Sequence, residues 1–294
     1  MKYEIKNNYL CIKIQDNLNN QNLNALLNLI GFNSKNKNFL ITNKYISRKN
    51  EILNANSILY KRDIIKILLY LPKNDKLSPY NSFLDVVYED ELFLIVNKPN
   101  GILVHPDTNN NTKTLANIVA NYYLNNNYNI SVRPIHRLDI ETSGLIIFSK
   151  SEFFQPILDK MLQEKKISRY YYALVEGFIE PNSELTIDKP IGKNRHKSNQ
   201  YIVYANGKKS TTHVKAISYD NESNTTLVEC KLDTGRTHQI RVHLSSINHP
   251  IINDSIYFKK SNLTNSLALQ AYKIKFFHPL LEEYITIKIK LNLK

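Results

Sequence analysis

The chain is poor in cysteine and glycine and contains no long apolar run. Its two cysteines, Cys11 and Cys230, are too few for a disulfide framework or a cysteine metal cluster. No stretch reaches the roughly 18 consecutive apolar residues that a membrane-spanning helix needs. The opening segment, Met1–Lys6, lacks the apolar core of a secretory signal. We therefore expect a protein of the reducing cytoplasm that does not span a membrane.

Positive charge is in surplus, with 39 Lys and Arg residues against 26 Asp and Glu, a formal charge of +13. Such a surplus suits an anionic partner such as RNA, DNA or a membrane surface. Lysine and asparagine are abundant along the whole chain, as an AT-rich genome would make them, so charge alone does not select the partner. The hydrophobic fraction of 42% is ample for a packed core, which excludes a disordered chain.

Scarce residue types gather in two segments. Glycine occurs only seven times and arginine is far rarer than lysine. An arginine in a lysine-rich chain suggests a planar, bidentate contact, and a glycine suggests left-handed backbone or close packing. Together, the segments His136–Gly144, HRLDIETSG, and Thr234–Arg241, TGRTHQIR, contain three of the eight arginines and two of the seven glycines. They are the leading candidates for a functional site.

Residues 1–80 differ in pattern from the rest of the chain. Leu23–Ile30 reads as a helix ended by Gly31, Asp63–Tyr70 reads as a strand, and Pro72–Pro79 reads as a linker. We predict a small N-terminal module over residues 1–80 and a larger domain over residues 81–294.

The larger region mixes strands and helices without regular alternation. Helices are predicted after Thr114, as N-cap, and after Ser151. Strands are predicted at Leu92–Val96, Leu145–Phe148, Arg169–Val175, Val214–Ala216, Leu227–Leu232 and Tyr284–Leu291. This order predicts an α+β fold with a mixed, mostly antiparallel central sheet and flanking helices.

A further helix is predicted after Thr237, as N-cap, with apolar Ile240, Leu244 and Ile247 on one face. Arg241 would lie on another face of this helix, one turn from His238. His238 and His243 are five residues apart and do not converge as metal ligands at i and i+4 would, so we expect no metal site.

Asp139 allows two interpretations from the residue types alone. A carboxylate on a loop beside a buried strand can act as a nucleophile or a base. It can equally be a turn former, with Arg137 in a surface ion pair.

The motifs in their order resemble the pseudouridine synthases of the RluA/RluD type. His136–Gly144 is similar to that family's HRLDxxTSG motif, and Thr234–Leu244 to TGRTHQIRVHL. Shorter segments follow in the same order, namely Asn97–Gly101 as NKPxG, Arg169–Gly177 as KxYxALVxG, Pro190–Gly192 as PIG, Gly207–Thr212 as GKxAxT and Phe276–Pro279 as FxHP. The resemblance spans roughly residues 85–290.

The resemblance implies an isomerase that breaks the N1–C1′ bond of uridine, turns the base and rejoins it through C5, without a cofactor. It implies Asp139 as the essential carboxylate, either attacking the nucleotide or taking a proton from the sugar. Arg241 would keep this carboxylate ionised, because burial alone raises a carboxyl pKa. Tyr171 would stack on the everted base, whereas Tyr170 and Tyr172 alternate onto the opposite face of the strand.

RNA is the expected partner, ribosomal RNA first and transfer RNA second, and the protein is expected to be a monomer. RNA contacts are assigned to His136, Arg137, Lys193, Arg195, Lys208, Arg236 and His238, with ordinary surface charge as the alternative for the loop residues. The competing functional hypothesis is a non-catalytic RNA-binding or ribosome-assembly factor that keeps the fold.

Three departures from the family pattern lie outside the proposed nucleophile: Arg169 in place of lysine, Asn253 in place of the glycine before Asp254, and Gln270 in place of histidine. Related proteins carry an S4-type RNA-binding module at the N-terminus. Ile58–Leu68 faintly resembles that module's last strand, so residues 1–80 are interpreted as a diverged S4-like module.

Overall fold

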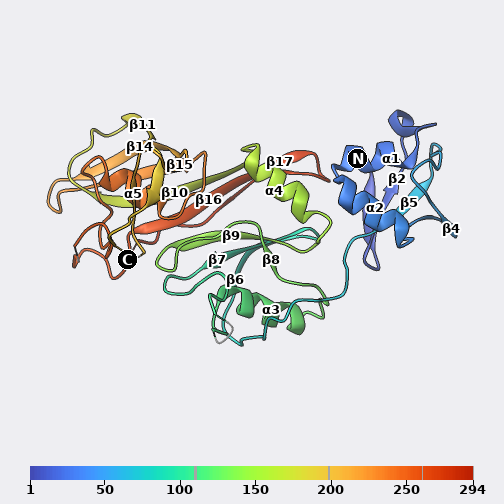
Figure 1. Cartoon of the computed structure of the whole chain (residues 1–294), viewed down its shortest axis with the longest axis horizontal. Coiled ribbons are helices and arrows are strands. Elements are labelled where there is room, and N and C mark those ends of the chain that lie inside the picture. Colours follow the sequence, from blue (N-terminus) through green and yellow to red (C-terminus); the bar gives the residue numbers. More distant parts are fainter. Residues whose placement is uncertain (109–110, 198, 260, 294) are drawn as a thin grey trace.

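The N-terminal residues form a five-stranded sheet with two helices packed on it. In the computed structural model, which describes residues 1–108, 111–197, 199–259 and 261–293, the strand order is β1-β2-β5-β3-β4. The strands are β1 (Tyr3–Lys6), β2 (Tyr9–Lys13), β3 (Ile46–Arg48), β4 (Glu51–Ile52) and β5 (Ile64–Leu68), and the helices are α1 (Leu23–Ile30) and α2 (Ser34–Thr42), after a short 3-10 turn at Asp16–Leu18. Figure 1 shows this part at one end of an elongated molecule.

Helix α1 begins and ends where the sequence predicts. The Asn22 side chain accepts a hydrogen bond from the Ala25 N–H at 3.0 Å, which caps the first turn. Gly31 ends the helix in the left-handed conformation, with φ of 96°. Its four apolar residues at helical spacing, Leu23, Leu26, Leu27 and Ile30, are buried against the sheet.

A ten-stranded mixed sheet runs through the rest of the molecule, in the order β11-β14-β15-β10-β16-β9-β7-β6, with β17 beside β16 and β8 beside β9. Its strands are β6 (Asp85–Glu89), β7 (Phe93–Lys98), β8 (Arg133–Pro134), β9 (Ser143–Ser149), β10 (Ile167–Glu176), β11 (Glu184–Asp188), β14 (Thr211–Asp220), β15 (Thr225–Leu232), β16 (Leu269–His278) and β17 (Glu283–Lys288). The described strand pairs are antiparallel except β9 with β16. The predicted α+β class with a mostly antiparallel sheet is therefore confirmed.

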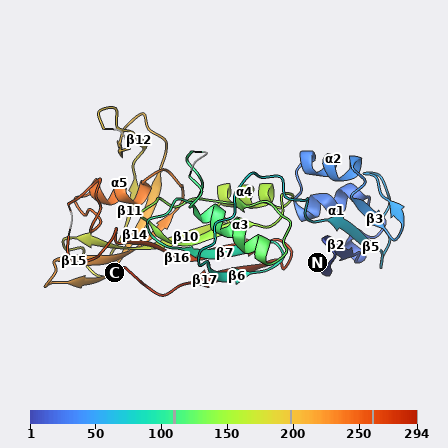
Figure 2. The same ribbon diagram turned by 90° about the horizontal axis from the view of Figure 1, so that it is seen from below.

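Helices α3 (Leu115–Asn125), α4 (Gln155–Gln163) and α5 (Gln239–Ser245) lie on the same side of this sheet, as Figure 2 shows. A separate hairpin of β12 (Ile191–Lys193) and β13 (Tyr201–Val203) projects on that side too. Thr114 begins α3 as predicted, and its N–H donates to the Asn117 side chain at 3.2 Å. Among the described helices, none is long and apolar enough to cross a membrane.

The predicted N-terminal boundary of the last helix is wrong. Helix α5 begins at Gln239, and His238, not Thr237, is the N-cap, in the left-handed conformation with φ of 55°. The Gln239 side-chain oxygen accepts hydrogen bonds from the Arg236 N–H at 3.0 Å and the Thr234 hydroxyl at 2.7 Å, which fixes this start. Ile240 and Leu244 are buried as predicted, but Ile247 lies beyond the helix.

The N-terminal part packs against the start of α4. The rings of Phe32 and Phe154 lie 5.3 Å apart edge to face, and those of Phe39 and Phe153 lie 6.0 Å apart. The Asn36 amide donates to the Phe153 carbonyl at 2.9 Å. Buried residues of both sheets belong to one continuous apolar cluster. The intervening residues 69–84 contain no helix or strand.

The parallel contact between β9 and β16 depends on Gly144. This residue has a φ of 116° and pairs with Ala271, and a Cβ placed on it would lie 2.2 Å from the Ala271 carbonyl oxygen. Gly144 belongs to β9, and here the two backbones approach too closely for a side chain, as the scarcity of glycine in this chain suggests.

We predict that Gly144→Ala lowers the free energy of unfolding by at least about 3 kcal/mol, through left-handed strain and a backbone clash. Gly101→Ala is the matched control, because Gly101 has a φ of 85° but no atom within 4 Å of the added Cβ. Gly101→Ala is expected to lower the free energy of unfolding by about 1–2 kcal/mol. Urea unfolding of both variants measures the difference, and equal losses would refute the role of the close approach.

Candidate active site

The two segments singled out in the sequence meet at one cleft of about 540 Å³. One wall is the loop Ile135–Asp139 with Thr142, and the other is Leu232–Arg241. Arg169 and Tyr171 of β10 also line it. The sheet thus brings together residues that are far apart in the sequence, on the side of the molecule that carries α5.

Asp139 lies on the loop between β8 and β9, and its side chain keeps 20% of its surface exposed. The Thr142 N–H donates to the Asp139 carbonyl at 3.1 Å, closing a tight turn directly after the acid. This hydrogen bond uses the main-chain carbonyl of Asp139 and not its carboxylate. The carboxylate faces Arg241 of α5.

Lys98 binds the backbone of this loop. It lies in the NKPNG segment, and no role was assigned to it from the sequence. Its fully buried ammonium donates to the carbonyls of Pro99 and Ile102 at 2.9 Å and of Ile140 at 3.1 Å. Burial lowers the pKa of Lys98 to about 8, and the Asp139 charge acts in the opposite direction. Lys98 therefore fixes the backbone beside Asp139.

Arg241 is the nearest fixed cation to Asp139. Its side chain is only 1% exposed, and its Nη1 lies 3.8 Å from Asp139 Oδ2. Its Nε and Nη2 donate to the two oxygens of Asp254 at 2.8 and 2.7 Å, and Nη2 also lies 2.9 Å from Glu141 Oε2. Burial opposes the charged form, but the bond to Asp254 raises the pKa of Arg241. The guanidinium is therefore a permanent charge with Nη1 left to face Asp139.

Asp254, fully buried, was not recognised from the sequence. Besides Arg241, its Oδ1 accepts the backbone N–H groups of Ile256 and Tyr257 at 3.0 and 3.1 Å. The preceding Asn253 has a φ of 61°, which explains how asparagine replaces the family's glycine there. That departure was the signal that could have marked Asp254 as part of a fixed turn.

His238 is the second group that faces Asp139, with Nε2 4.0 Å from Oδ2. Its Nδ1 lies 3.0 Å from the Tyr257 hydroxyl, which also accepts the Tyr201 N–H at 2.9 Å. Burial lowers the pKa of His238, although the Asp139 carboxylate opposes the shift. The imidazole is therefore neutral at neutral pH, and Arg241 supplies the charge.

Tyr171 lines the cleft and is 5% exposed, as the alternation along β10 predicts. Burial raises the pKa of Tyr171, so the ring enters the cleft as a neutral phenol. On the opposite face, Tyr172 stacks on Tyr272 at 3.8 Å, and the Lys273 ammonium lies 3.8 Å from the Tyr170 ring centroid.

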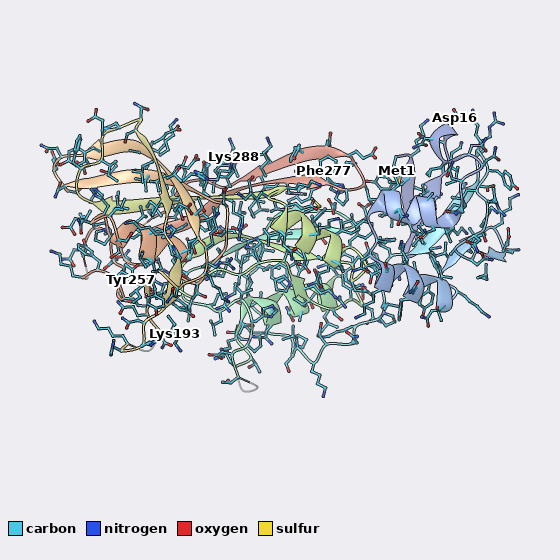
Figure 3. All side chains as sticks on the ribbon, turned by 45° about the horizontal axis from the view of Figure 1, so that its top comes forward. Met1, Asp16, Lys193, Tyr257, Phe277 and Lys288 are labelled. Atoms are coloured by element: carbon cyan, nitrogen blue, oxygen red, sulfur yellow. The ribbon has the colours of Figure 1, made fainter. Side chains whose placement is uncertain are left out.

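The remaining predicted residues fall into two groups. Arg137 and Arg236 are exposed at the cleft, and His136 lines it from a half-buried position. Lys193, Arg195 and Lys208 are exposed on and beside the β12–β13 hairpin and do not line the cleft; Figures 2 and 3 show this hairpin projecting from the body.

No group of three or more His, Cys, Asp or Glu side chains in the described part of the chain is arranged to hold a metal ion. His243, considered as a metal ligand and rejected from its spacing, is fully buried. Its two ring nitrogens lie within 2.9 Å of the Thr212 hydroxyl and the Lys189 carbonyl. Cys230 is buried in β15 and burial raises the pKa of its thiol well above the ordinary value.

The RNA pseudouridylate synthase family model matches residues 92–246, more than half of the chain. The chain belongs to this family of enzymes. The RNA pseudouridine synthase YhcT of Bacillus subtilis, named as uncharacterized, is 39% identical over 83% of this chain and 81% of its own length. The ribosomal large subunit pseudouridine synthase D of Buchnera aphidicola is 37% identical over 69% and 68%, which agrees with the RluA/RluD type.

The pseudouridine synthase fold is also seen in a solved structure. Human RNA Pseudouridylate Synthase Domain Containing 1 superposes with a TM-score of 0.60 at 24% identity, covering 71% of this chain and 83% of that protein. At this identity the likeness concerns the fold alone. It agrees with the mixed α+β architecture predicted from the sequence.

We predict that His136 makes this pseudouridine synthase acid-sensitive. Burial lowers the pKa of His136 to about 3. The unfolded chain, with an ordinary histidine pKa near 6.5, takes up this proton as the pH falls while the folded protein does not. The free energy of unfolding should therefore decrease between pH 6.5 and 3 by up to about 1.4 kcal/mol per pH unit.

Urea unfolding of the wild type and of His136→Gln at pH values of about 7, 6 and 5 measures this contribution. The decline should be shallower in the variant, because the other titrating groups are common to both proteins. Equal decreases in the free energy of unfolding of the two proteins would contradict a His136 that stays neutral in the folded state.

Proposed function

We propose that this pseudouridine synthase converts a uridine of large-subunit ribosomal RNA to pseudouridine, with Asp139 as the reacting carboxylate. One observation carries the proposal: Asp139 faces the buried Arg241 guanidinium at 3.8 Å inside a cleft of about 540 Å³. A cleft of this kind suits a nucleotide that has left its base stack, as base-modifying enzymes require.

The reaction is an isomerisation in which all atoms of the uridine are retained. The N1–C1′ bond breaks, the base turns, and C5 forms the new bond to C1′ while its proton passes to N1. Asp139 either attacks the nucleotide or removes a proton from the sugar, and both routes need the ionised carboxylate. Arg241 provides the charge that favours this form when the base displaces water from the cleft.

Tyr171 is proposed to stack on the everted uracil, which is worth roughly 1–3 kcal/mol per base. Arg137 and Arg236, exposed at the rim, and His136 and His238, inside the cleft, are proposed to contact the RNA around that nucleotide. Lys193, Arg195 and Lys208 on the projecting hairpin are proposed to bind phosphates farther away. The exposure of these basic side chains supports this division.

The proposal of ribosomal RNA is supported by relatives named ribosomal large subunit pseudouridine synthase D in Buchnera aphidicola, Zymomonas mobilis and Nitrosomonas europaea. Transfer RNA is the second candidate. Mapping of pseudouridines in total RNA from cells with and without the gene distinguishes the two, since the missing position identifies the substrate.

Residues 1–80 are proposed to be a separate RNA-binding module, and residues 81–294 the catalytic domain. Support comes from a hollow of about 530 Å³ in the N-terminal part, lined by the exposed Lys2, Lys13, Lys61 and Arg62. Asp16 also lines the hollow and pairs with Lys61 at 2.6 Å, which leaves Lys2, Lys13 and Arg62 for the phosphates of an RNA backbone.

We predict that Asp139→Asn reduces pseudouridine formation at least about a hundredfold, because the amide cannot act as nucleophile or base. RNA from cells lacking the gene serves as substrate, and RNA affinity should be retained. Asp233→Asn is the matched control: Asp233 also lines the cleft but is paired with Lys165 at 2.6 Å and His213 at 3.3 Å. Substantial turnover by the Asp139 variant would refute the assignment.

We predict that the double variant Lys2→Ala and Lys13→Ala weakens RNA binding several-fold without changing the thermal midpoint, because both side chains are exposed. Equilibrium RNA binding at fixed salt is the measurement. An unchanged affinity would remove the proposed role of the hollow.

A further inference from the structure

Arg169, the residue that departs from the family's lysine, is a cation without an ion-pair partner among the residues that the structure describes. It is only 8% exposed and lines the cleft on the same face of β10 as Tyr171. No ion pair joins it to another described residue, and its Nε has no hydrogen-bond partner. The hydration of Nε is therefore lost and not replaced, and the charge has no counter-ion among the described residues, which is costly for a side chain this buried.

The acids of the cleft do not supply the missing counter-ion. Asp139 faces Arg241 and His238, and Asp233 is paired with Lys165 and His213. The guanidinium instead lies against backbone: a Cβ built on Gly235 would be 3.0 Å from its Nη1. Gly235, without a side chain, thus admits Arg169 to the wall of the cleft.

A second donor beside Arg169 is also unsatisfied. The Ile147 N–H donates to His136 Nε2 at 3.3 Å, so the proton of the neutral imidazole lies on Nδ1, and this atom is buried without a partner. His136 and Arg169 line the same cleft. The cleft therefore contains two buried donors without a partner, Arg169 Nε and His136 Nδ1.

We propose that Arg169 binds a phosphate next to the target uridine and so anchors the everted nucleotide while Asp139 reacts. This rests on the proposed function. An everted uridine brings two kinds of acceptor, the neutral carbonyls of the base and the charged phosphates of its backbone. An unpaired guanidinium favours the phosphate, because the anion supplies the missing counter-charge and accepts two parallel N–H bonds.

The salt dependence of RNA binding tests this. Each phosphate contact adds roughly 0.7 to the slope of log affinity against log salt for single-stranded RNA. Arg169→Met should reduce the slope by about that amount and lower kcat/KM about 10- to 100-fold, as expected for a charged hydrogen bond. Arg169→Lys, which keeps the charge but not the planar fork, should recover the slope and only part of kcat/KM.

Lys215→Met is the matched control, because it removes one charge from an exposed side chain of β14, between the buried Val214 and Ala216. Slopes are measured as equilibrium binding of RNA from cells lacking the gene, with each variant placed in the Asp139→Asn background. The binding result is thus independent of turnover, so failure of the proposed catalysis and failure of the phosphate contact are separate outcomes.

An unchanged slope in Arg169→Met overturns the proposal. If kcat/KM falls while the slope stays constant, Arg169 contacts the base or braces the loop instead. If Arg169→Met and Arg169→Lys both lower the thermal midpoint while both keep the slope of the wild type, the role of Arg169 is purely structural. A reduced slope restored by lysine supports the phosphate contact.

Discussion

A single guanidinium, that of Arg241, is shared by three carboxylates. Asp254 takes two of its N–H groups, Glu141 shares Nη2, and Asp139 faces Nη1 at 3.8 Å. Arg241 and Asp254 are almost fully buried, and removal of either partner would leave an uncompensated buried ion. These ion pairs therefore stabilise the relative positions of helix α5, the loop before β9 and the turn at Asp254.

The sheet supplies those positions through its one described parallel contact. Gly144 allows β9 to approach β16, and the loop that ends at this glycine carries Asp139 and Glu141. Lys98 ties the same loop to the end of β7 through the Ile140 carbonyl. The position of Asp139 in the cleft thus depends on backbone packing at the centre of the sheet.

Sequence reasoning succeeded where a signal is local. Helix α1 follows from four apolar residues and Gly31, and the alternation along β10 places Tyr171 and not its neighbours in the cleft. Asp254 and Lys98 were missed because their importance comes from partners distant in the chain. The start of α5 was misplaced because a histidine in left-handed conformation, held by Tyr257, has no recognisable pattern. Asn253 was identified as a departure from the family's glycine, but the sequence did not show that its left-handed backbone forms the turn at Asp254.

The aromatic contact between the N-terminal part and α4 has a consequence for how the enzyme can be divided. Phe153 and Phe154 are buried beside Phe39 and Phe32. A Cβ placed on Gly31 would lie 3.8 Å from the Ile157 side chain. A chain shortened to residues 81–294 would expose this apolar surface, and we expect it to self-associate. The N-terminal part thus shares an apolar interior with the larger part, and an RNA-binding test of either part is best made in the full chain.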